Sequence, residues 1–331
     1  MIQFLADNID QLDLALDQLA IGDRNFDRFA LMLIDNVVEL TLHRHAQDKA
    51  SENELWLSID KPKYQIKDIE LATGKNFEPK VKFAKKLGIL SQESCDSILN
   101  LHNFRNTAYH QGQRHEGILH SITIFYFINA CDVLLSYSPR FWSWSSSDQL
   151  SHRARKYLGK DAPLGDHAKR FQSAFRRLRD VALSMKEDLV GDLYADMSET
   201  ITHVHEAIDF LFTNRKDETT RDRIVMECQA WKFASTDEGK EFIKTKRCKA
   251  KSGPAIVEWL IKNYKWPIVS DPIPSWLKRL AKLKSEKNYH LALKRYCDFM
   301  RQTESIRETV IESAIELENY IQMQIDIARG K

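Results

Sequence analysis

The sequence predicts an almost wholly α-helical protein built from two helical domains. Apolar residues recur at steps of three and four over long stretches, which is the period of an amphipathic helix. Only 11 glycines and 8 prolines occur in 331 residues, so turns are sparse and the helices are expected to be long. No glycine-rich loop and no alternation of strand and helix points to a nucleotide-binding sheet.

Two apolar stripes predict the first two helices. The stripe within residues 1–20 consists of Ile2, Leu5, Ile9, Leu12, Leu16 and Leu19. The stripe within residues 26–42 consists of Phe26, Phe29, Leu33, Val37 and Leu40. Asp23 precedes the second stripe and is expected to be its N-cap, because a side-chain oxygen there can accept hydrogen bonds from the first turn. Both helices should bury one face.

The rest of the first domain is expected to form three further helices. Residues 79–104 are expected to form two short helices, with Pro79 near the start, Gly88 at the stop between them and Ser91 as the second N-cap. Residues 118–135 are apolar nearly all round. This last helix is therefore expected at the centre of the domain.

A break in the helical pattern divides the chain. Around residues 136–152 a proline, two tryptophans and a serine cluster replace the helical period. The sequence therefore predicts a first domain over residues 1–140 and a second helical domain, of unknown type, over residues 150–331. Three prolines at 264–276 mark a possible boundary within the second domain, and two helices are expected after them.

Composition limits the cellular setting. The five cysteines are scattered and form no C-x-x-C pair, which is typical of free thiols in a reducing cytoplasm. No stretch approaches the ~20 apolar residues of a membrane helix, and the N-terminus lacks the basic region of a signal peptide. We therefore expect a cytoplasmic protein without a membrane partner. The formal net charge of +2 means that any nucleic-acid surface must come from local clustering of charge.

The most informative motif lies in residues 101–112. Arg105 and His110 form an R-x4-H pair, with Asn106 directly after the arginine. Histidine can transfer protons at neutral pH, and arginine stays charged and can fork onto phosphate oxygens. Asparagine can orient the imidazole or bond the phosphate without adding charge. These are the residue types that cleavage of RNA at its 2′-hydroxyl requires.

The motif and its surroundings resemble the HEPN superfamily. Residues 33–45, with polar Asp35, Asn36 and Glu39 on an apolar background, are similar to its early helix, and residues 85–110 are similar to the helix that leads into its R-x4-H motif. The resemblance covers residues 1–140. It implies a metal-independent endoribonuclease of the toxin or anti-phage defence type, which needs no cofactor and leaves a 2′,3′-cyclic phosphate. It also implies a homodimer and admits an antitoxin or other defence-system partner.

One position departs from that pattern. A HEPN toxin group has a tyrosine two residues after the histidine, where its antitoxin modifies it, and this chain has Gly112 there. That form of regulation is therefore not expected. Tyr109 precedes the histidine instead and is a candidate supporting residue whose role is open.

Helical geometry constrains the proposed site. Asn106 and His110 are four apart and share a helical face, whereas Arg105 and His110 point roughly 140° apart at ~3.6 residues per turn. Either the helix is broken here, or two chains build the site, and the resemblance favours a homodimer with facing motifs. Asp35 and Glu39 share a face of the neighbouring helix. They are expected to form a solvated or salt-bridged pair, or to steady Arg105.

Other clusters give weaker indications. The pairs His43/His45 and His203/His205 do not suit a metal, because alternate residues on a helix point apart, and no metal site is expected. Cations interleaved with aromatic residues near the C-terminus suit RNA phosphates and bases, although solvated helix faces give the same pattern. The RNA-binding candidates are Lys278, Arg279, Lys282, Lys294 and Arg295. A second basic stretch consists of Lys244, Lys246, Arg247, Lys249 and Lys251.

Two alternatives to a nuclease stay open. Arg105 can be a surface arginine paired to a carboxylate, and His110 a polar residue at a helix end. The chain would then be a non-catalytic HEPN-like binding or scaffold protein for a nucleic acid or protein partner. A DNA-binding regulator ranks last, because no helix-turn-helix with a short glycine-containing turn is evident.

Overall fold

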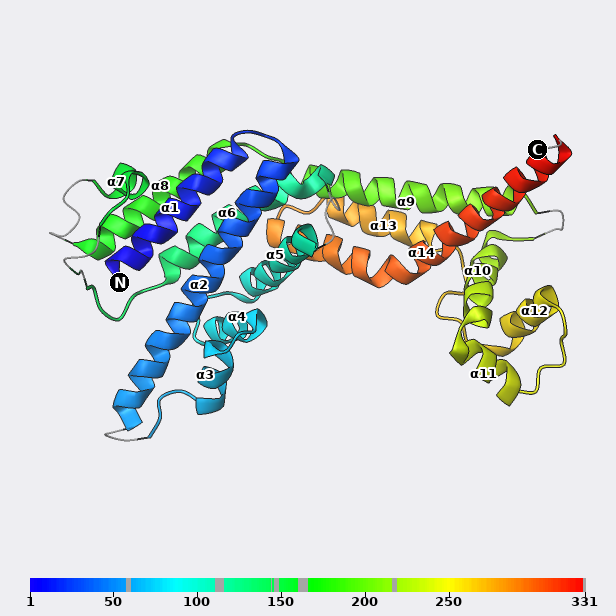
Figure 1. Ribbon diagram of the computed structural model, residues 1–331, viewed down its shortest axis with the longest axis horizontal. Helices are drawn as coiled ribbons and strands as arrows, with labels where there is room; N and C mark the ends of the chain where they lie inside the picture. The colour runs from blue at the N-terminus through cyan, green and yellow to red at the C-terminus, as the bar shows by residue number, and fades with distance from the viewer. Residues whose placement is uncertain are drawn as a thin grey trace. The chain divides into compact units, whose positions relative to one another are not determined.

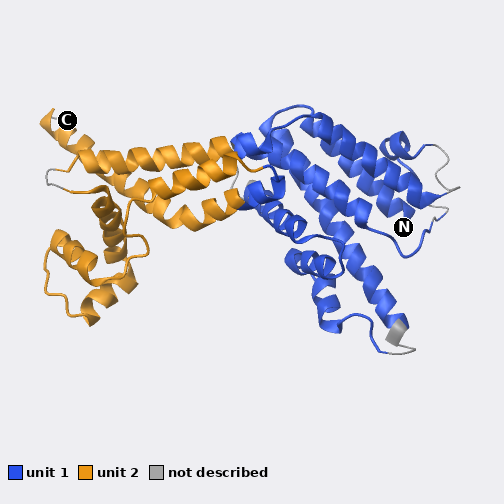
Figure 2. Cartoon of the chain, turned by 180° about the vertical axis from the view of Figure 1, so that it is seen from behind, with its two compact units in different colours: residues 1–193, 287–294 blue, residues 194–286, 295–331 orange. Residues whose placement is uncertain are grey.

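The computed structural model describes residues 1–57, 61–110, 116–143, 145, 149–159, 166–215 and 219–329. In these residues the secondary structure is entirely helical, which confirms the predicted all-α class (Figure 1). The chain divides into two compact units. Unit 1 comprises Met1–Leu193 and Lys287–Lys294, and unit 2 comprises Tyr194–Glu286 and Arg295–Lys331 (Figure 2).

Unit 1 extends beyond the first predicted domain. Its helices are α1 (Ile2–Leu19), α2 (Arg24–Leu57), α3 (Ile66–Thr73), α4 (Phe77–Lys86), α5 (Gln92–His110), the 3-10 turn η1 (Glu116–Ile118), α6 (Leu119–Ser136), α7 (His152–Leu158), α8 (His167–Ser184) and the first residues of α9 (Leu189–Thr213) and of α14 (Tyr289–Ala328). Helices α7 and α8 pack against α1, and α8 also packs against α6. Residues 150–193 therefore belong to the first compact unit, whereas the sequence placed the boundary at 140–150.

Helix α6 forms the centre of unit 1, as its all-round apolar sequence predicted. It packs against α2 and α8, and Ile122, Tyr126 and Phe127 are completely buried. By length and composition α6 is also the one described helix that qualifies as a membrane span. Most of it is buried within the unit, so its apolar character is that of a core helix.

The face that α2 buries differs from the predicted stripe. The stripe of α1 is buried throughout, but Phe29 and Leu40 of α2 are exposed by 55% and 39%. The buried residues of α2 include Ala30, Leu31, Ile34, Asp35, Val37, Val38, Thr41, Leu42, His45 and Ala46. Helix α2 contacts α1, α3, α4, α5 and α6. Its buried surface is therefore set by several neighbours, and a single stripe does not describe it.

Local signals at helix ends are confirmed. Asp23 Oδ1 accepts a hydrogen bond from the Asn25 amide at 2.9 Å, and Ser91 Oγ accepts one from the Ser94 amide at 3.0 Å. Gly88 follows α4 with φ +76°, a left-handed conformation that costs glycine little.

Unit 2 contains the rest of α9, α10 (Arg221–Ser235), α11 (Asp237–Thr245), α12 (Gly253–Asn263), α13 (Ile273–Lys284) and α14 (Tyr289–Ala328) from Arg295 onward. The three prolines of 264–276 lie after α12 and at the start of α13. An aromatic cluster joins α10, α11 and α12, and its members are Phe233, Phe242, Trp259, Tyr264 and Trp266.

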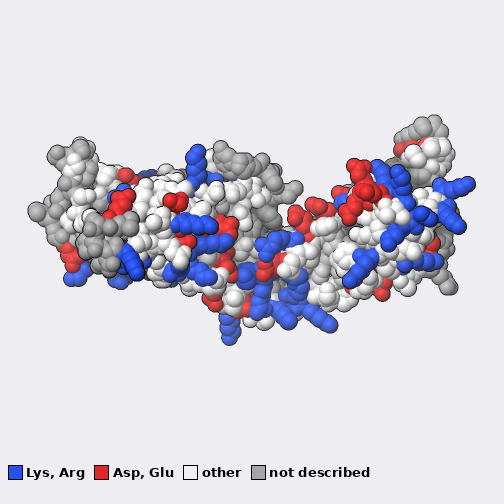
Figure 3. Space-filling view, turned by 90° about the horizontal axis from the view of Figure 1, so that it is seen from below, with Lys and Arg blue, Asp and Glu red and all other residues white. Residues whose placement is uncertain are grey.

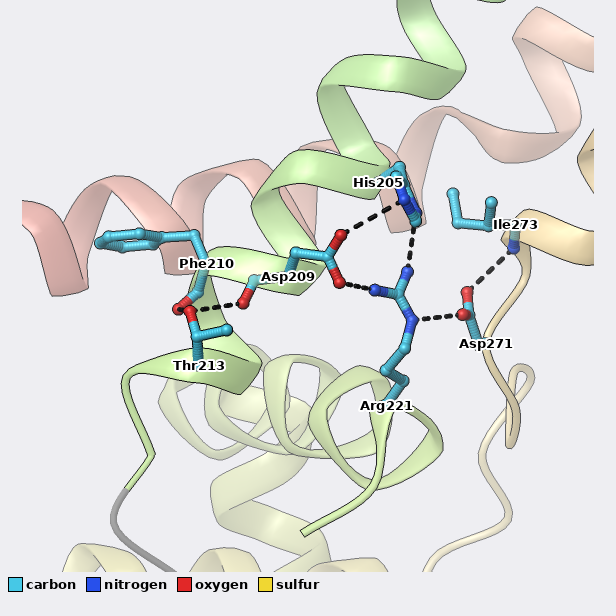
Figure 4. Close-up of polar contacts among 7 residues, drawn as sticks. All are labelled: His205, Asp209, Phe210, Thr213, Arg221, Asp271 and Ile273. Atoms are coloured by element: carbon cyan, nitrogen blue, oxygen red, sulfur yellow. Dashed lines mark hydrogen bonds and ion pairs between the residues drawn. The ribbon is translucent and has the colours of Figure 1, made fainter.

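One arginine joins three segments of unit 2. Arg221, the first residue of α10, donates from Nε to Asp271 at 2.6 Å and pairs with Asp209 of α9 (Figure 4). Its third nitrogen lies 3.0 Å from Nδ1 of His205. Asp271 also accepts the Ile273 amide at 3.0 Å. The network fastens the start of α10 to α9 and to the start of α13.

A histidine at the start of α6 is expected to make stability depend on pH. His120 Nδ1 lies 2.7 Å from Asp27 Oδ1, and Nε2 lies 3.7 Å from Glu187. The hydrogen bond to Asp27 raises the pKa of His120 above its ordinary value of 6.5, although burial opposes this. A raised pKa in the folded state means that this stabilisation is complete below about pH 6.5 and is lost as pH rises through the raised value.

Melting of the parent protein and the His120→Gln variant between about pH 5.5 and about pH 8.5 tests this. The difference in melting temperature should be larger at the acidic end. An equal difference at both ends would contradict the assignment.

Candidate functional site

The structure brings together two predicted site residues in unit 1. Asp35, in the middle of α2, has a completely buried side chain, whereas 31% of the Arg105 side chain on α5 is exposed. Arg105 Nε lies 3.2 Å from Asp35 Oδ2. A buried carboxylate without a partner costs several kcal/mol, so the arginine is strongly favoured at this position. Asp35 therefore holds the inner edge of the Arg105 guanidinium.

Asp35 is the centre of a larger polar network. Tyr126 on α6 donates its hydroxyl to Oδ1 at 2.7 Å, and His102 Nδ1 lies 2.9 and 3.2 Å from the two oxygens. Burial, together with the charge of Asp35, raises the pKa of Tyr126 well above its ordinary value of 10, so the hydroxyl stays protonated and donates. Helices α5 and α6 thus direct three side chains onto one carboxylate of α2.

His102 is a member of the site that the sequence reasoning missed. It stands one turn before Arg105 on α5, so the two share a helical face. Its ring stacks on Phe77 of α4 with centroids 4.0 Å apart. When Nδ1 carries the proton and donates to Asp35, Nε2 is left as the acceptor of the imidazole. The sequence could have identified His102 by its spacing of three residues from Arg105, which places both on one face of a helix.

The other polar residues fall into two groups. Asn106 Oδ1 accepts a hydrogen bond from Arg105 at 3.0 Å, so it lies beside the guanidinium. Glu39, one turn after Asp35, lies 3.6 Å from the buried ammonium of Lys80. Lys80 also donates to the carbonyls that follow α3, those of Gly74 and Asn76, at 2.8 and 3.0 Å. Glu39 therefore belongs to a contact that fixes α3 and α4.

Two predicted residues lie outside the described side chains. Tyr109 and His110 are the last residues of α5, and only their backbone is described, while Gly112 falls in the part not described. Helix α5 is continuous from Gln92 through His110. Positions 105 and 110 therefore lie roughly 140° apart around the axis of one regular helix. The described backbone gives no support to a broken helix between them.

The five C-terminal cations do not form one set. Lys294 belongs to unit 1 and pairs with Asp96 at 2.8 Å. Arg295 belongs to unit 2 and pairs with Glu286 at 2.9 Å. The remaining three, Lys278, Arg279 and Lys282, lie on α13. The second basic stretch runs from α11 toward α12, and on the face in Figure 3 Lys and Arg side chains are interspersed with Asp and Glu.

The remaining histidines and the cysteines form no metal site in the described ranges, where no group of three or more ligating side chains comes together. Burial lowers the pKa of His45 to about 4, and His205 belongs to the Arg221 network (Figure 4). All five cysteines are free, and burial raises the pKa of Cys131 well above its ordinary range.

Comparison with known protein families, with characterised proteins and with solved structures finds no match to this chain.

Proposed function

We propose that this chain is a metal-independent endoribonuclease of the toxin or anti-phage defence type, with a HEPN-like first domain. Arg105, Asn106 and His110 would act on RNA in the cytoplasm without a cofactor, and an antitoxin or defence-system partner would restrain or trigger the enzyme. The observation that carries the proposal is the buried Asp35 carboxylate 3.2 Å from Arg105. It fixes a partly exposed guanidinium beside Asn106, which lies four residues before the motif histidine His110.

The chemistry assigns one task to each residue. The 2′-hydroxyl attacks the adjacent phosphorus, and His110 accepts its proton. The leaving 5′-oxygen then takes this proton back from the protonated His110, so the bond from phosphorus to the 5′-oxygen breaks and the products are a 2′,3′-cyclic phosphate and a 5′-hydroxyl. Arg105 stabilises the negative charge that develops on the phosphate oxygens, and Asp35 holds the guanidinium in place beforehand. Asn106, one turn before His110, orients the imidazole or bonds the phosphate.

A homodimer completes the proposed site. Because α5 is a continuous helix, positions 105 and 110 of one chain lie on different faces of it, and we infer that a single phosphate is contacted by Arg105 and His110 from two chains. An isologous interface brings the same segment of two chains to the symmetry axis. The Arg105 of one protomer can then face the His110 of its partner. Two arginines near one axis repel each other unless an anion lies between them, and an RNA phosphate supplies it.

A scaffold role is the second candidate function. The observation that favours it is the closed network at Asp35, where Arg105, His102 and Tyr126 all contact one carboxylate. Such a network also stabilises packing of α2, α5 and α6 without any chemistry. Growth and cellular RNA integrity after induction of the parent protein and the His110→Ala variant separate the two functions. A nuclease is toxic and degrades RNA only in the parent form, whereas a scaffold gives intact RNA in both.

Cleavage is expected to need no metal ion. The proposed mechanism uses an arginine for charge stabilisation and a histidine for proton transfer, and neither role requires a divalent cation. Purified protein should cleave labelled RNA equally with and without a chelator. Complete loss of cleavage in the chelator, restored by magnesium, would contradict the mechanism.

A further inference from the structure

Unit 2 contains a pocket of about 310 Å³ that the proposed cleavage does not use. It lies among α9, α13 and α14, which run side by side in Figure 1. Its lining residues are Met197, Arg279, Lys282, Arg295, Asp298 and Gln302. Arg279 and Lys282 are one turn apart on α13, and Arg295, Asp298 and Gln302 follow one another at helical spacing on α14. The sequence pattern itself therefore directs them to one place.

The lining carries excess positive charge. Three cations face one carboxylate, that of Asp298, and this carboxylate already pairs with Arg301 at 2.5 Å. Arg295 pairs with Glu286 at 2.9 Å. Within the part of the chain that the structure describes, neither Arg279 nor Lys282 forms an ion pair. Two cations of this pocket are thus without a protein carboxylate.

Arg279 lies against an aromatic ring and has no salt-bridge partner among the described residues. Its guanidinium carbon lies 5.0 Å from the ring centroid of Phe299, and Trp276 meets the same ring edge-on at 5.5 Å. Burial lowers the pKa of Arg279 from its ordinary value, against the opposing charge of Asp298. One turn further along α13, the Lys282 carbonyl accepts a hydrogen bond from Arg295 of α14 at 3.3 Å. A stacked and partly desolvated arginine is prepared for an anion that the protein does not itself supply.

We propose that this pocket binds a small phosphate ester of a sugar, of the size of a sugar phosphate or a mononucleotide. The phosphate lies among Arg279, Lys282 and Arg295, whose donors match its several oxygens. Asp298 and Gln302 supply hydrogen-bonding groups for sugar hydroxyls, and the buried Met197 supplies an apolar contact. This site lies in unit 2 and does not depend on the proposed RNA cleavage.

A small ligand fits the pocket better than an RNA strand. Ligand pockets span about 300–1,000 Å³, so a pocket of about 310 Å³ accepts only a small molecule. A strand needs cations that continue along its backbone. Lys278 is not part of the lining, and Lys294 pairs with Asp96 in unit 1. The cations therefore converge on one point.

Calorimetric titration of the full chain tests the proposal. The probes are ribose 5-phosphate, adenosine monophosphate, unphosphorylated ribose and a short single-stranded DNA, which lacks the 2′-hydroxyl and so escapes cleavage. The two phosphate esters should bind, and ribose should not. Arg279→Gln should weaken binding at least about tenfold, because it removes a charge-assisted hydrogen bond to the phosphate. Lys278→Gln, with the same loss of charge on the same helix outside the pocket, should change binding less than about twofold.

Each other outcome would overturn the proposal. Absence of binding by both phosphate esters excludes the ligand class. Equal weakening by Arg279→Gln and Lys278→Gln would show that binding depends on the overall positive charge of α13 and not on the pocket. Tight binding of the DNA strand alone assigns the surface to a nucleic-acid backbone. If Arg279→Gln melts far below the parent protein, Lys282→Gln, on an exposed side chain, replaces it with the same expected loss.

Discussion

Replacing Asp35 with alanine is expected to lower the free energy of unfolding by about 3–5 kcal/mol, because the buried Tyr126 hydroxyl loses its acceptor and the partly buried Arg105 loses its counter-charge. Asp35 is completely buried, and three groups depend on it. Without Asp35, the Tyr126 hydroxyl is buried without an acceptor, and Arg105 loses the adjacent anion. Denaturant unfolding of the parent and variant chains measures the difference.

Two variants serve as controls for Asp35. Glu39→Gln, one turn away on α2, removes a carboxylate that is one-third exposed and 3.6 Å from Lys80. It should cost less than Asp35→Ala, because the glutamine keeps an acceptor and the buried ammonium still donates to the carbonyls of Gly74 and Asn76. Tyr126→Phe removes one hydrogen bond of the network and should cost about 1 kcal/mol. If Asp35→Ala destabilises no more than Glu39→Gln, the carboxylate is not the centre of the packing between α2, α5 and α6.

The largest functional effect is expected at Arg105. Arg105→Ala should reduce RNA cleavage by at least about 100-fold, which is typical for loss of one group that stabilises charge in a transition state. Arg105→Lys should not restore it, because an ammonium lacks the planar fork that contacts Asp35 and a phosphate together. Arg105→Ala also removes the cation beside the buried Asp35 carboxylate and should lower the melting temperature, so cleavage is compared below the melting transition of the variant. Retained cleavage with an unchanged melting temperature would show that the catalytic site lies elsewhere.

Alanine variants of the two histidines of α5 distinguish two versions of the catalytic site, in which the proton is transferred by His110 or by His102. If His110 transfers the proton, His110→Ala abolishes cleavage, whereas His102→Ala lowers stability and leaves most of the cleavage. If the imidazole held by Asp35 transfers it, His102→Ala abolishes cleavage and His110→Ala does not. We expect the first pattern, because the R-x4-H motif defines the resemblance on which the proposed function rests.

Features that depend on neighbouring residues were predictable from sequence. The caps at Asp23 and Ser91 and the all-round apolar α6 are local, and each is found as expected. The Asp35 network was predictable only in part, because His102 and Tyr126 are 67 and 91 residues away along the chain. Only tertiary packing brings such residues together.

The basic C-terminal residues illustrate a second limit. Lys294 and Arg295 are adjacent in sequence but point about 100° apart on α14. One pairs with Asp96 in unit 1 and the other with Glu286 in unit 2. Charge density along the sequence therefore did not show which cations share a surface. The unit boundary within α9 was equally hidden, because helical periodicity continues through it.

Mixing two inactive variants tests the proposed composite site most directly. In a heterodimer of Arg105→Ala and His110→Ala chains, one of two sites keeps the arginine of one protomer and the histidine of its partner. Random pairing makes about half of the dimers mixed, so the mixture should recover up to about one quarter of the parent activity. Each variant alone should stay inactive. A mixture that remains inactive, or a strictly monomeric parent chain that still cleaves RNA, would contradict the composite site.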